Sequence, residues 1–67
     1  GTAGIPDIIA CLHGRFLAFE VKTETGKLSK LQEITIQRIK EAEGKAFTVR
    51  SAAEVAAILK DMEDEAL

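Results

Sequence analysis

The hydrophobic and polar positions in the first third of the chain predict a β-hairpin. Residues 8–12 and 15–21 form two short, β-prone apolar runs with only His13 and Gly14 between them. A two-residue connection suits a primed turn, in which Gly14 readily adopts the positive φ of the second central position and His13 must adopt the first. The segment 16–19 is apolar at every position, as expected of a central strand that is covered on both faces.

A polar loop and an amphipathic helix are predicted to follow the hairpin. Residues 23–28 are mostly polar and include Gly26, which is typical of a loop. Ser29 and Gln32 have the spacing of a capping box, so we expect the helix to begin there. Gly44 suits the left-handed position just beyond the helix end.

The apolar positions of this helix form one face that we expect to pack on the sheet. Ile36 lies to the side of this face. Arg38 lies within it, so its aliphatic stem must run along apolar surface or its guanidinium must find an acid. The expected packing face consists of Leu31, Ile34, Thr35, Ile39 and Ala42.

A third strand and a second helix complete the predicted fold. Residues 47–49 form a short β-prone run, and the helix before them makes a crossover of the βαβ type. Ser51 and Glu54 match a second capping box, and we expect the acidic residues 63–65 to fray. The apolar stripe of this last helix is Ala52, Val55, Ile58, Leu59 and Met62. We therefore predict an α/β fold in which a hairpin and a crossover strand form a mixed three-stranded sheet with two helices.

Length and cysteine content limit how such a domain can be stabilised. The chain has 67 residues, enough for one domain that buries only about 60% of the surface of its unfolded chain. Cys11 is the single cysteine, so no disulfide can form within the chain, and Cys11 with His13 is too small a set for structural zinc. We expect Cys11 to be a small core residue and the protein to be intracellular, in a reducing setting.

Charge is unevenly distributed along the chain. The net charge is −2, yet residues 1–50 carry eight Lys and Arg against six Asp and Glu, whereas residues 51–67 carry one Lys against five acids. The net charge argues against a generally basic nucleic-acid binder, and the mildly basic body, whose acids Asp7 and Glu20 a metal ion would neutralise, weakens this objection without removing it. No apolar stretch is long enough to cross a bilayer, so we expect no membrane association.

Candidate chemistry gathers at one end of the predicted hairpin. Side chains alternate along a strand, so Glu20 and Lys22 project to the same face while Val21 projects to the other. Asp7 begins the neighbouring strand directly after Pro6, whose ring stiffens the approach. Because the start of one antiparallel strand adjoins the end of the other, we expect Asp7 to lie beside Glu20 and Lys22.

The two carboxylates predict a site for a divalent metal ion. Asp7 and Glu20 would repel each other unless a cation neutralised them. Mg²⁺ prefers oxygen ligands and keeps several waters, so these carboxylates, the backbone carbonyl of Val21 and a substrate phosphate would complete its shell. Lys22 could orient or help deprotonate the attacking water, or stabilise negative charge on a phosphate. Together these roles describe metal-assisted phosphodiester hydrolysis.

The same residues resemble a known group of nucleases. The pair Pro6-Asp7 followed by the triplet at residues 20–22 resembles the PD-(D/E)xK signature. Residues 4–7, 19–22 and 28–32 resemble the motifs of its VRR-NUC branch. The resemblance implies that Asp7 and Glu20 are metal ligands and that Lys22 is the catalytic lysine. It further implies that Gln32 faces the site from the helix start.

For the whole protein, the resemblance implies a Mg²⁺- or Mn²⁺-dependent endodeoxyribonuclease with a small restriction-endonuclease-like core. Its likeness to small stand-alone members, typical of phages and bacteria, implies a homodimer that cuts branched DNA such as Holliday junctions. Ile36 is then a candidate dimer contact. The family also implies an upstream helix with a further acidic ligand. Because the chain starts at Gly1 without Met, we expect residues 1–67 to be one nuclease domain truncated at its N-terminus.

Simpler interpretations of these residues stay open. An ExK triplet alone usually marks a solvated strand end, and capping explains Gln32 as well as an active-site role does. His13 is most simply a turn residue. Arg15, Lys27 and Lys30 are candidates for phosphate contacts, although basic residues in loops are usually just solvated. For the whole protein, the alternatives are a non-catalytic DNA-binding or assembly module on a nuclease-like scaffold, and a protein-interaction domain without a nucleic-acid partner.

Overall fold

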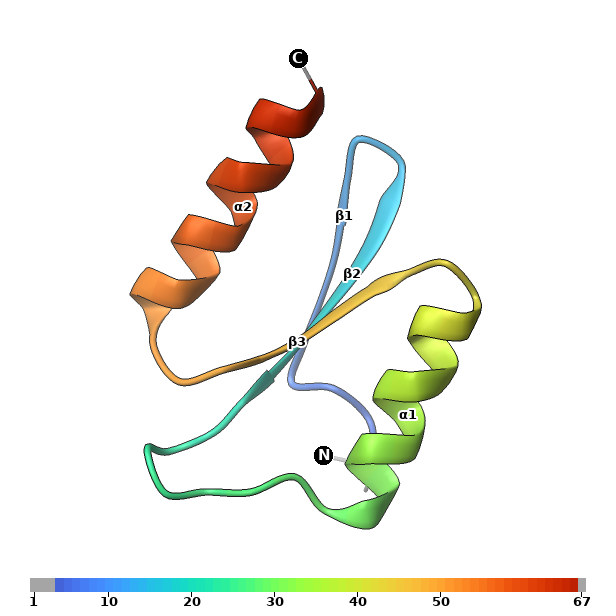
Figure 1. Ribbon diagram of the computed structural model, residues 1–67, viewed down its shortest axis with the longest axis vertical. Coiled ribbons are helices and arrows are strands. Elements are labelled where there is room, and N and C mark those ends of the chain that lie inside the picture. The colour runs from blue at the N-terminus through green and yellow to red at the C-terminus, as the bar shows by residue number, and fades with distance from the viewer. Residues whose placement is uncertain (1–3, 67) are drawn as a thin grey trace.

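Strands and helices alternate after an initial hairpin. The computed structural model describes residues 4–66. The elements are the strands β1 (Ile8–Leu12), β2 (Arg15–Val21) and β3 (Lys45–Val49) and the helices α1 (Lys30–Glu41) and α2 (Ala52–Ala66). The sheet has the order β1-β2-β3, and Figure 1 shows α1 and α2 on opposite sides of it. The predicted α/β fold, with a mixed three-stranded sheet and two helices, is confirmed.

The β-hairpin forms as the pattern predicts. β1 and β2 are antiparallel, with Ile8 opposite Phe19. Both turn residues, His13 and Gly14, have a positive φ, at 51° and 77°. These angles are those of a primed two-residue turn, whose twist matches that of the strands it joins.

The hydrophobic core lies between the sheet and α2. β3 is parallel to β2 and places Phe47 opposite Phe19, with 5.5 Å between the centroids of the stacked rings. Leu17 and Phe19 are fully buried on this side, together with Val49 of β3. Because Ala18, on the opposite face, is buried as well, β2 is the central strand, as predicted. The predicted stripe of α2 packs on this core through Val55, Ile58, Leu59 and Met62.

Helix α1 buries only part of the face that its apolar pattern predicts, namely Thr35 and Ile39. Ile36 and Ile39 are partly buried, whereas Leu31 and Ile34 are 55% and 38% exposed. The helix lies closest to β3, and its Leu31 and Thr35 lie beside Gly4. The dimer contact of Ile36 stays a prediction, and Leu31 and Ile34 are more exposed apolar residues of the same helix.

The start of α1 follows the prediction and its end does not. Oγ of Ser29 accepts a hydrogen bond from N–H of Gln32 at 3.2 Å, and Oε1 of Gln32 accepts one from N–H of Ser29 at 2.8 Å, which is a complete capping box. At the other end, Glu43 and not Gly44 has the left-handed conformation, with φ of 68°. Gly44 is needed for space instead, because a Cβ there would lie 2.9 Å from Cγ2 of Ile39.

The acidic end of α2 stays helical to Ala66, so the prediction that it frays is wrong. Two contacts with the hairpin hold it. Oε2 of Glu63 lies 2.9 Å from Nε2 of His13, and Oε2 of Glu65 lies 3.8 Å from Nη1 of Arg15. Within residues 4–66, neither helix combines the length and apolar content that crossing a membrane requires.

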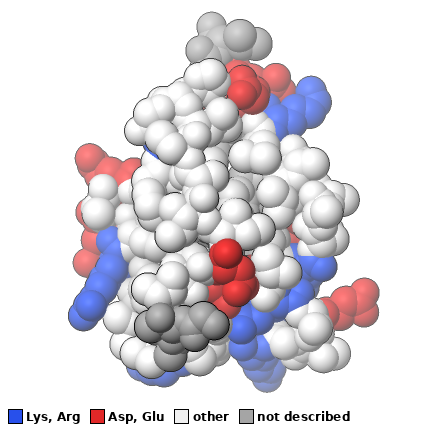
Figure 2. Space-filling view, turned by 180° about the vertical axis from the view of Figure 1, so that it is seen from behind, with Lys and Arg blue, Asp and Glu red and all other residues white. Residues whose placement is uncertain are grey.

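β1 is an edge strand without charged side chains. Ile8 and Ile9 are 43% and 56% exposed. Cys11 is exposed too, so the prediction that it belongs to the core is wrong: it faces the α1 side, where the helix does not reach over β1. β1 lies behind β3 in Figure 1, and Figure 2 views the molecule from that side. White, uncharged surface fills most of the upper centre of this view, one red acidic group stands just below the centre, and Lys and Arg lie toward the margin.

Candidate active site

Glu20 is the centre of a polar cluster at the C-terminal end of β2. The residue is only 5% exposed. Its Oε1 accepts a hydrogen bond from Nε2 of Gln32 at 2.5 Å and lies 3.6 Å from Nζ of Lys22. Burying a carboxylate is unfavourable unless its partners compensate for the lost water. A carboxylate that is buried beside a lysine is therefore a candidate for chemistry as well as for stability.

The hairpin brings Asp7 to the same end of β2. The register that pairs Ile8 with Phe19 puts Asp7, one residue earlier, next to Glu20. Oδ2 of Asp7 accepts a hydrogen bond from N–H of Val21 at 2.8 Å. This bond holds the carboxylate against the strand, and its other oxygen can take a further ligand.

Lys22 completes the strand side of the cluster. Its side chain is 20% exposed and projects to the same face as Glu20. Its backbone N–H donates to the carbonyl oxygen of Val49 in β3 at 2.9 Å, so both neighbouring strands fix this end of β2. Glu20 and Lys22 contact each other, and Asp7 is hydrogen-bonded to N–H of Val21, the residue between them.

Gln32 connects α1 to this cluster. Its Oε1 accepts the capping hydrogen bond from Ser29, while its Nε2 donates to Glu20. The capping role and the contact with the site are therefore not alternatives, because the two ends of one amide serve both.

The oxygen donors of the cluster suit a hard divalent cation. Asp7 and Glu20 supply carboxylate oxygens, and the carbonyl of Val21 lies in the chain between Glu20 and Lys22. Mg²⁺ needs only one or two protein carboxylates, because waters and substrate phosphates complete its shell. No group of three or more His, Cys, Asp and Glu side chains within residues 4–66 could hold a metal ion. A structural zinc site, which needs four such ligands, does not fit.

The candidate phosphate-binding residues are divided between the two ends of β2. Lys27 and Lys30 are exposed and lie just before and at the start of α1, in the segment that leads from the strand side of the cluster to its helix side. Arg15 begins β2 at the far end from the cluster, where it lies near Glu65. The structure therefore brings Lys27 and Lys30 toward the cluster but not Arg15.

Arg50 is a further residue of this region that the sequence analysis missed. It follows β3 at the same end of the sheet as Lys22, because β3 is parallel to β2. Its Nη1 donates to the carbonyl oxygens of Thr23 and Gly26 in the loop after β2. The crossover contains the signal that could have found it, since parallel strands bring their carboxyl ends to one edge of a sheet.

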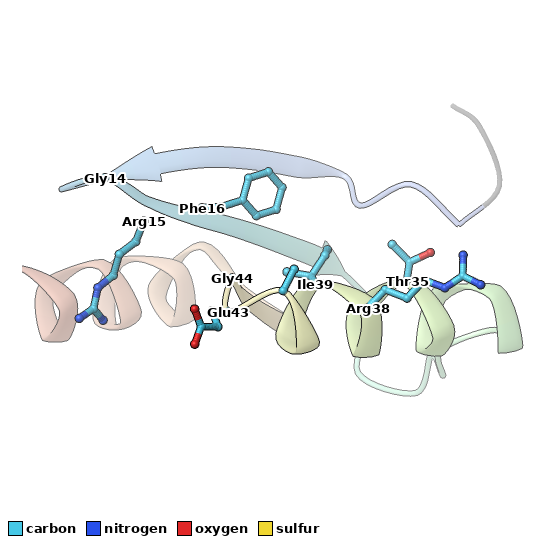
Figure 3. Close-up of a pocket in the computed structure, with 9 residues that line it drawn as sticks. Gly14, Arg15, Phe16, Thr35, Arg38, Ile39, Glu43 and Gly44 are labelled. Atoms are coloured by element: carbon cyan, nitrogen blue, oxygen red, sulfur yellow. The ribbon is translucent and has the colours of Figure 1, made fainter.

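A cavity of about 560 Å³ lies away from the polar cluster. Phe16 of β2 and Ile39 of α1 line it, and Arg15 and Arg38 lie toward its opposite ends (Figure 3). None of the four cluster residues lines this cavity. We place the site at the cluster, because the cavity is a mostly apolar gap between the end of α1 and β2, whereas the cluster holds the reactive groups.

A comparison with protein families decides where the chain belongs. The model of the VRR-NUC domain matches residues 1–53 of the 67-residue chain. The chain belongs to the VRR-NUC family. The resemblance seen in its motifs is thereby confirmed. Comparisons with curated proteins and with solved structures give no match.

Membership of the VRR-NUC family gives the cluster a chemical context. A VRR-NUC domain is a nuclease-type domain, so DNA is the class of substrate and divalent metal ions are the usual cofactors. The match includes the whole sheet and α1 and ends at the start of α2. All four cluster residues lie within it.

Proposed function

We propose that the protein is a Mg²⁺- or Mn²⁺-dependent endodeoxyribonuclease that uses Asp7, Glu20, Lys22 and Gln32. The observation that carries the proposal is the burial of Glu20 between the amide of Gln32 and the ammonium of Lys22. Packing alone is a poor reason for a charged group at this place, because an apolar residue of similar size would avoid the loss of hydration. A carboxylate needed for phosphodiester hydrolysis supplies a better reason.

Each polar group would have its own part in the reaction. Asp7, Glu20 and the carbonyl of Val21 would hold the cation, which when bound supplies Lewis acidity toward the phosphate and a more acidic water. Gln32 holds Glu20 in one orientation. Lys22 would orient the attacking water or stabilise negative charge on the phosphate, since its ammonium has three donors and lies at the Glu20 carboxylate.

We also propose branched DNA as the substrate and a homodimer as the active form. Lys27 and Lys30 are exposed beside the cluster, where they would contact phosphates near the cleaved bond. The uncharged β1 edge and the exposed Leu31 and Ile34 support a second copy as the partner, because open strand edges and large apolar patches rarely remain free. Two copies would carry two sites, as cutting two strands of a junction requires.

Cleavage of a four-way DNA junction tests this proposal. Wild-type protein should nick the junction with Mg²⁺ or Mn²⁺ and should stop when EDTA is added. Asp7→Asn and Glu20→Gln keep the size of each side chain but remove a ligand charge, and Lys22→Ala removes the ammonium. Each variant should lower the cleavage rate at least about 100-fold. Lys60→Ala, which disrupts an exposed ion pair with Asp64 on α2, is the matched control and should cut at the wild-type rate.

Other outcomes would favour the alternative, a non-catalytic DNA-binding or assembly module. Such a module would bind the junction equally well with and without Mg²⁺, lose affinity steeply as salt rises and release no product. Normal cleavage by Asp7→Asn or Lys22→Ala would show that the site is wrong. Equal cleavage of a linear duplex and of the junction would contradict the choice of branched DNA.

A further inference from the structure

Arg50 links the end of β3 to the loop that follows Lys22. Its Nη1 donates to the carbonyl oxygen of Thr23 and, at 3.0 Å, to that of Gly26. Its backbone N–H donates to Oε2 of Glu54 in the first turn of α2, at 3.2 Å. The backbone of Arg50 is therefore fixed on one side by β3, which it follows, and on the other by its hydrogen bond to Glu54 of α2.

The loop it contacts joins the two halves of the cluster. On one side the loop continues from Lys22, and on the other it leads to the capping box that presents Gln32. Apart from Gly26 and Leu28, residues 23–28 are exposed, so little apolar burial holds the loop in one conformation. Within the loop, N–H of Gly26 bonds to Oγ1 and to the carbonyl oxygen of Thr23, each at 3.1 Å. The guanidinium binds two carbonyl groups of that same turn, those of Thr23 and Gly26.

From these contacts we infer that Arg50 is a positioning residue for the nuclease site. By binding two carbonyl groups of one turn, it fixes the path of the chain between Lys22 and Gln32. Both of these residues contact Glu20, so the path sets how the ammonium and the amide meet the carboxylate. Hydrogen bonds from a charged donor are roughly twice as strong as neutral ones, which suits a role in holding a solvent-exposed loop. This inference rests on the proposed function.

A direct contact with DNA phosphate is the competing role for an exposed arginine at this place. The two roles differ in what they change. A phosphate contact contributes to binding, so its loss raises KM. It also makes the plot of the logarithm of affinity against the logarithm of salt concentration less steep, by about 0.9. A positioning residue acts on the alignment of the reacting groups, so its loss lowers kcat and leaves that slope unchanged.

Cleavage kinetics of Arg50→Ala and Arg50→Lys distinguish these roles. Arg50→Ala should lower kcat for junction cleavage about 10- to 100-fold, as expected when catalytic groups are displaced by about 1 Å, with KM changed less than about twofold. Arg50→Lys should restore part of the loss, because an ammonium can still donate to one of the two carbonyls. Lys45→Ala, which removes an exposed cation at the other end of β3, should behave as wild type. An unchanged kcat in Arg50→Ala, or a change confined to KM and the salt slope, would overturn the inference.

Amide hydrogen exchange tests the same inference without any measurement of cleavage. In Arg50→Ala, the amide of Gly26, which is hydrogen-bonded within the loop, should exchange at least about 10-fold faster than in wild type, while the amides of β2 keep their protection. If the wild-type protein does not cleave DNA, the proposed function fails, but this measurement still decides whether Arg50 holds the loop. Equal exchange of the loop in both proteins would show that it does not.

Discussion

Glu20 is a buried charge that depends on side chains from two different elements. Lys22 approaches it from β2, and Gln32 approaches it from α1. Removing one partner of a buried charge commonly costs about 3–5 kcal/mol, whereas an exposed pair such as Lys60 and Asp64 contributes about 0–1 kcal/mol. Residues that carry the chemistry of this site therefore also affect the stability of the fold.

Gln32→Glu separates the two roles of Gln32. The new carboxylate can still accept the capping hydrogen bond from N–H of Ser29, but it cannot donate to Glu20 and adds a like charge beside it. We expect the free energy of unfolding to fall by about 1.5–3 kcal/mol, the contribution of a hydrogen bond to a charged group, and the cleavage rate to fall at least about 10-fold. Denaturant unfolding and junction cleavage measure the two effects.

Gln37→Glu is the control for this substitution, because Gln37 is exposed on the same helix away from the cluster. Gln37→Glu should change the free energy of unfolding and the cleavage rate far less than Gln32→Glu does. Wild-type cleavage by Gln32→Glu, combined with a loss in Gln32→Ala, would mean that only the helix cap matters at this position.

The positions of Asp7, Glu20 and Lys22 could be predicted because strand alternation and a two-residue turn determine them. The same geometry could exclude Arg15 from the cluster, because a rise of about 3.3 Å per residue puts it roughly 17 Å from Glu20 along β2. The role of Arg50 could not be predicted. It depends on the direction of backbone carbonyls in a loop, which no pattern of side chains reports.

At the scale of elements, the connection from α1 to β3 is the most constrained. Glu43 takes the left-handed conformation that usually falls to glycine, and Gly44 takes the position where a side chain has no room. A Cβ at Gly44 would meet Cγ2 of Ile39 at 2.9 Å, its carbonyl oxygen at 3.2 Å and Cδ1 of Phe16 at 3.3 Å. The carbonyl belongs to the helix backbone and cannot move aside as a flexible side chain would.

Substitutions at Glu43 and Gly44 should change the free energy of unfolding in opposite directions. Gly44→Ala should lower the free energy of unfolding by about 1–3 kcal/mol, because the methyl group overlaps α1. Glu43→Gly removes the strain of a positive φ and should raise the same quantity by up to about 1 kcal/mol. Thermal and denaturant unfolding of both variants measure this. A greater loss in Glu43→Gly than in Gly44→Ala would restore the original expectation that position 44 is the left-handed one.

The elements themselves could be predicted, since turns, caps and apolar periods are local. How α1 packs could not. The apolar arc of the helix is wider than the part of the sheet it covers, so the sequence does not decide which residues of the arc are buried. Leu31, Ile34 and Cys11, all apolar in the sequence pattern, are accordingly exposed.

At the scale of the whole molecule, the acidic end of α2 and the polar cluster lie at opposite ends of β2. The acidic end of α2 lies against the hairpin turn through Glu63 and Glu65, at the far end of β2 from Glu20. Lys27, Lys30 and the rest of the loop lie at the end that carries the cluster. The acidic tail is therefore held away from the place proposed for DNA.

The oligomeric state tests the role of the β1 edge. Wild-type protein should have twice the 7.2 kDa mass of the chain in light scattering. Ile9→Lys should be a monomer, because a charge at this 56% exposed position would be buried without a partner in the interface. Ala53→Lys adds the same charge on exposed α2 and should leave the dimer intact. A wild-type monomer at the concentration that cleaves DNA would contradict the dimer.

The core on the α2 side has a consequence for the limits of the domain. The VRR-NUC match ends at residue 53, yet Val55, Ile58, Leu59 and Met62 cover Leu17 and Phe19 of the strand that ends in Glu20 and Lys22. The family match and the folding unit therefore end at different residues. Residues beyond the match therefore support the site, both through this packing and through Glu54, whose Oε2 accepts a hydrogen bond from N–H of Arg50.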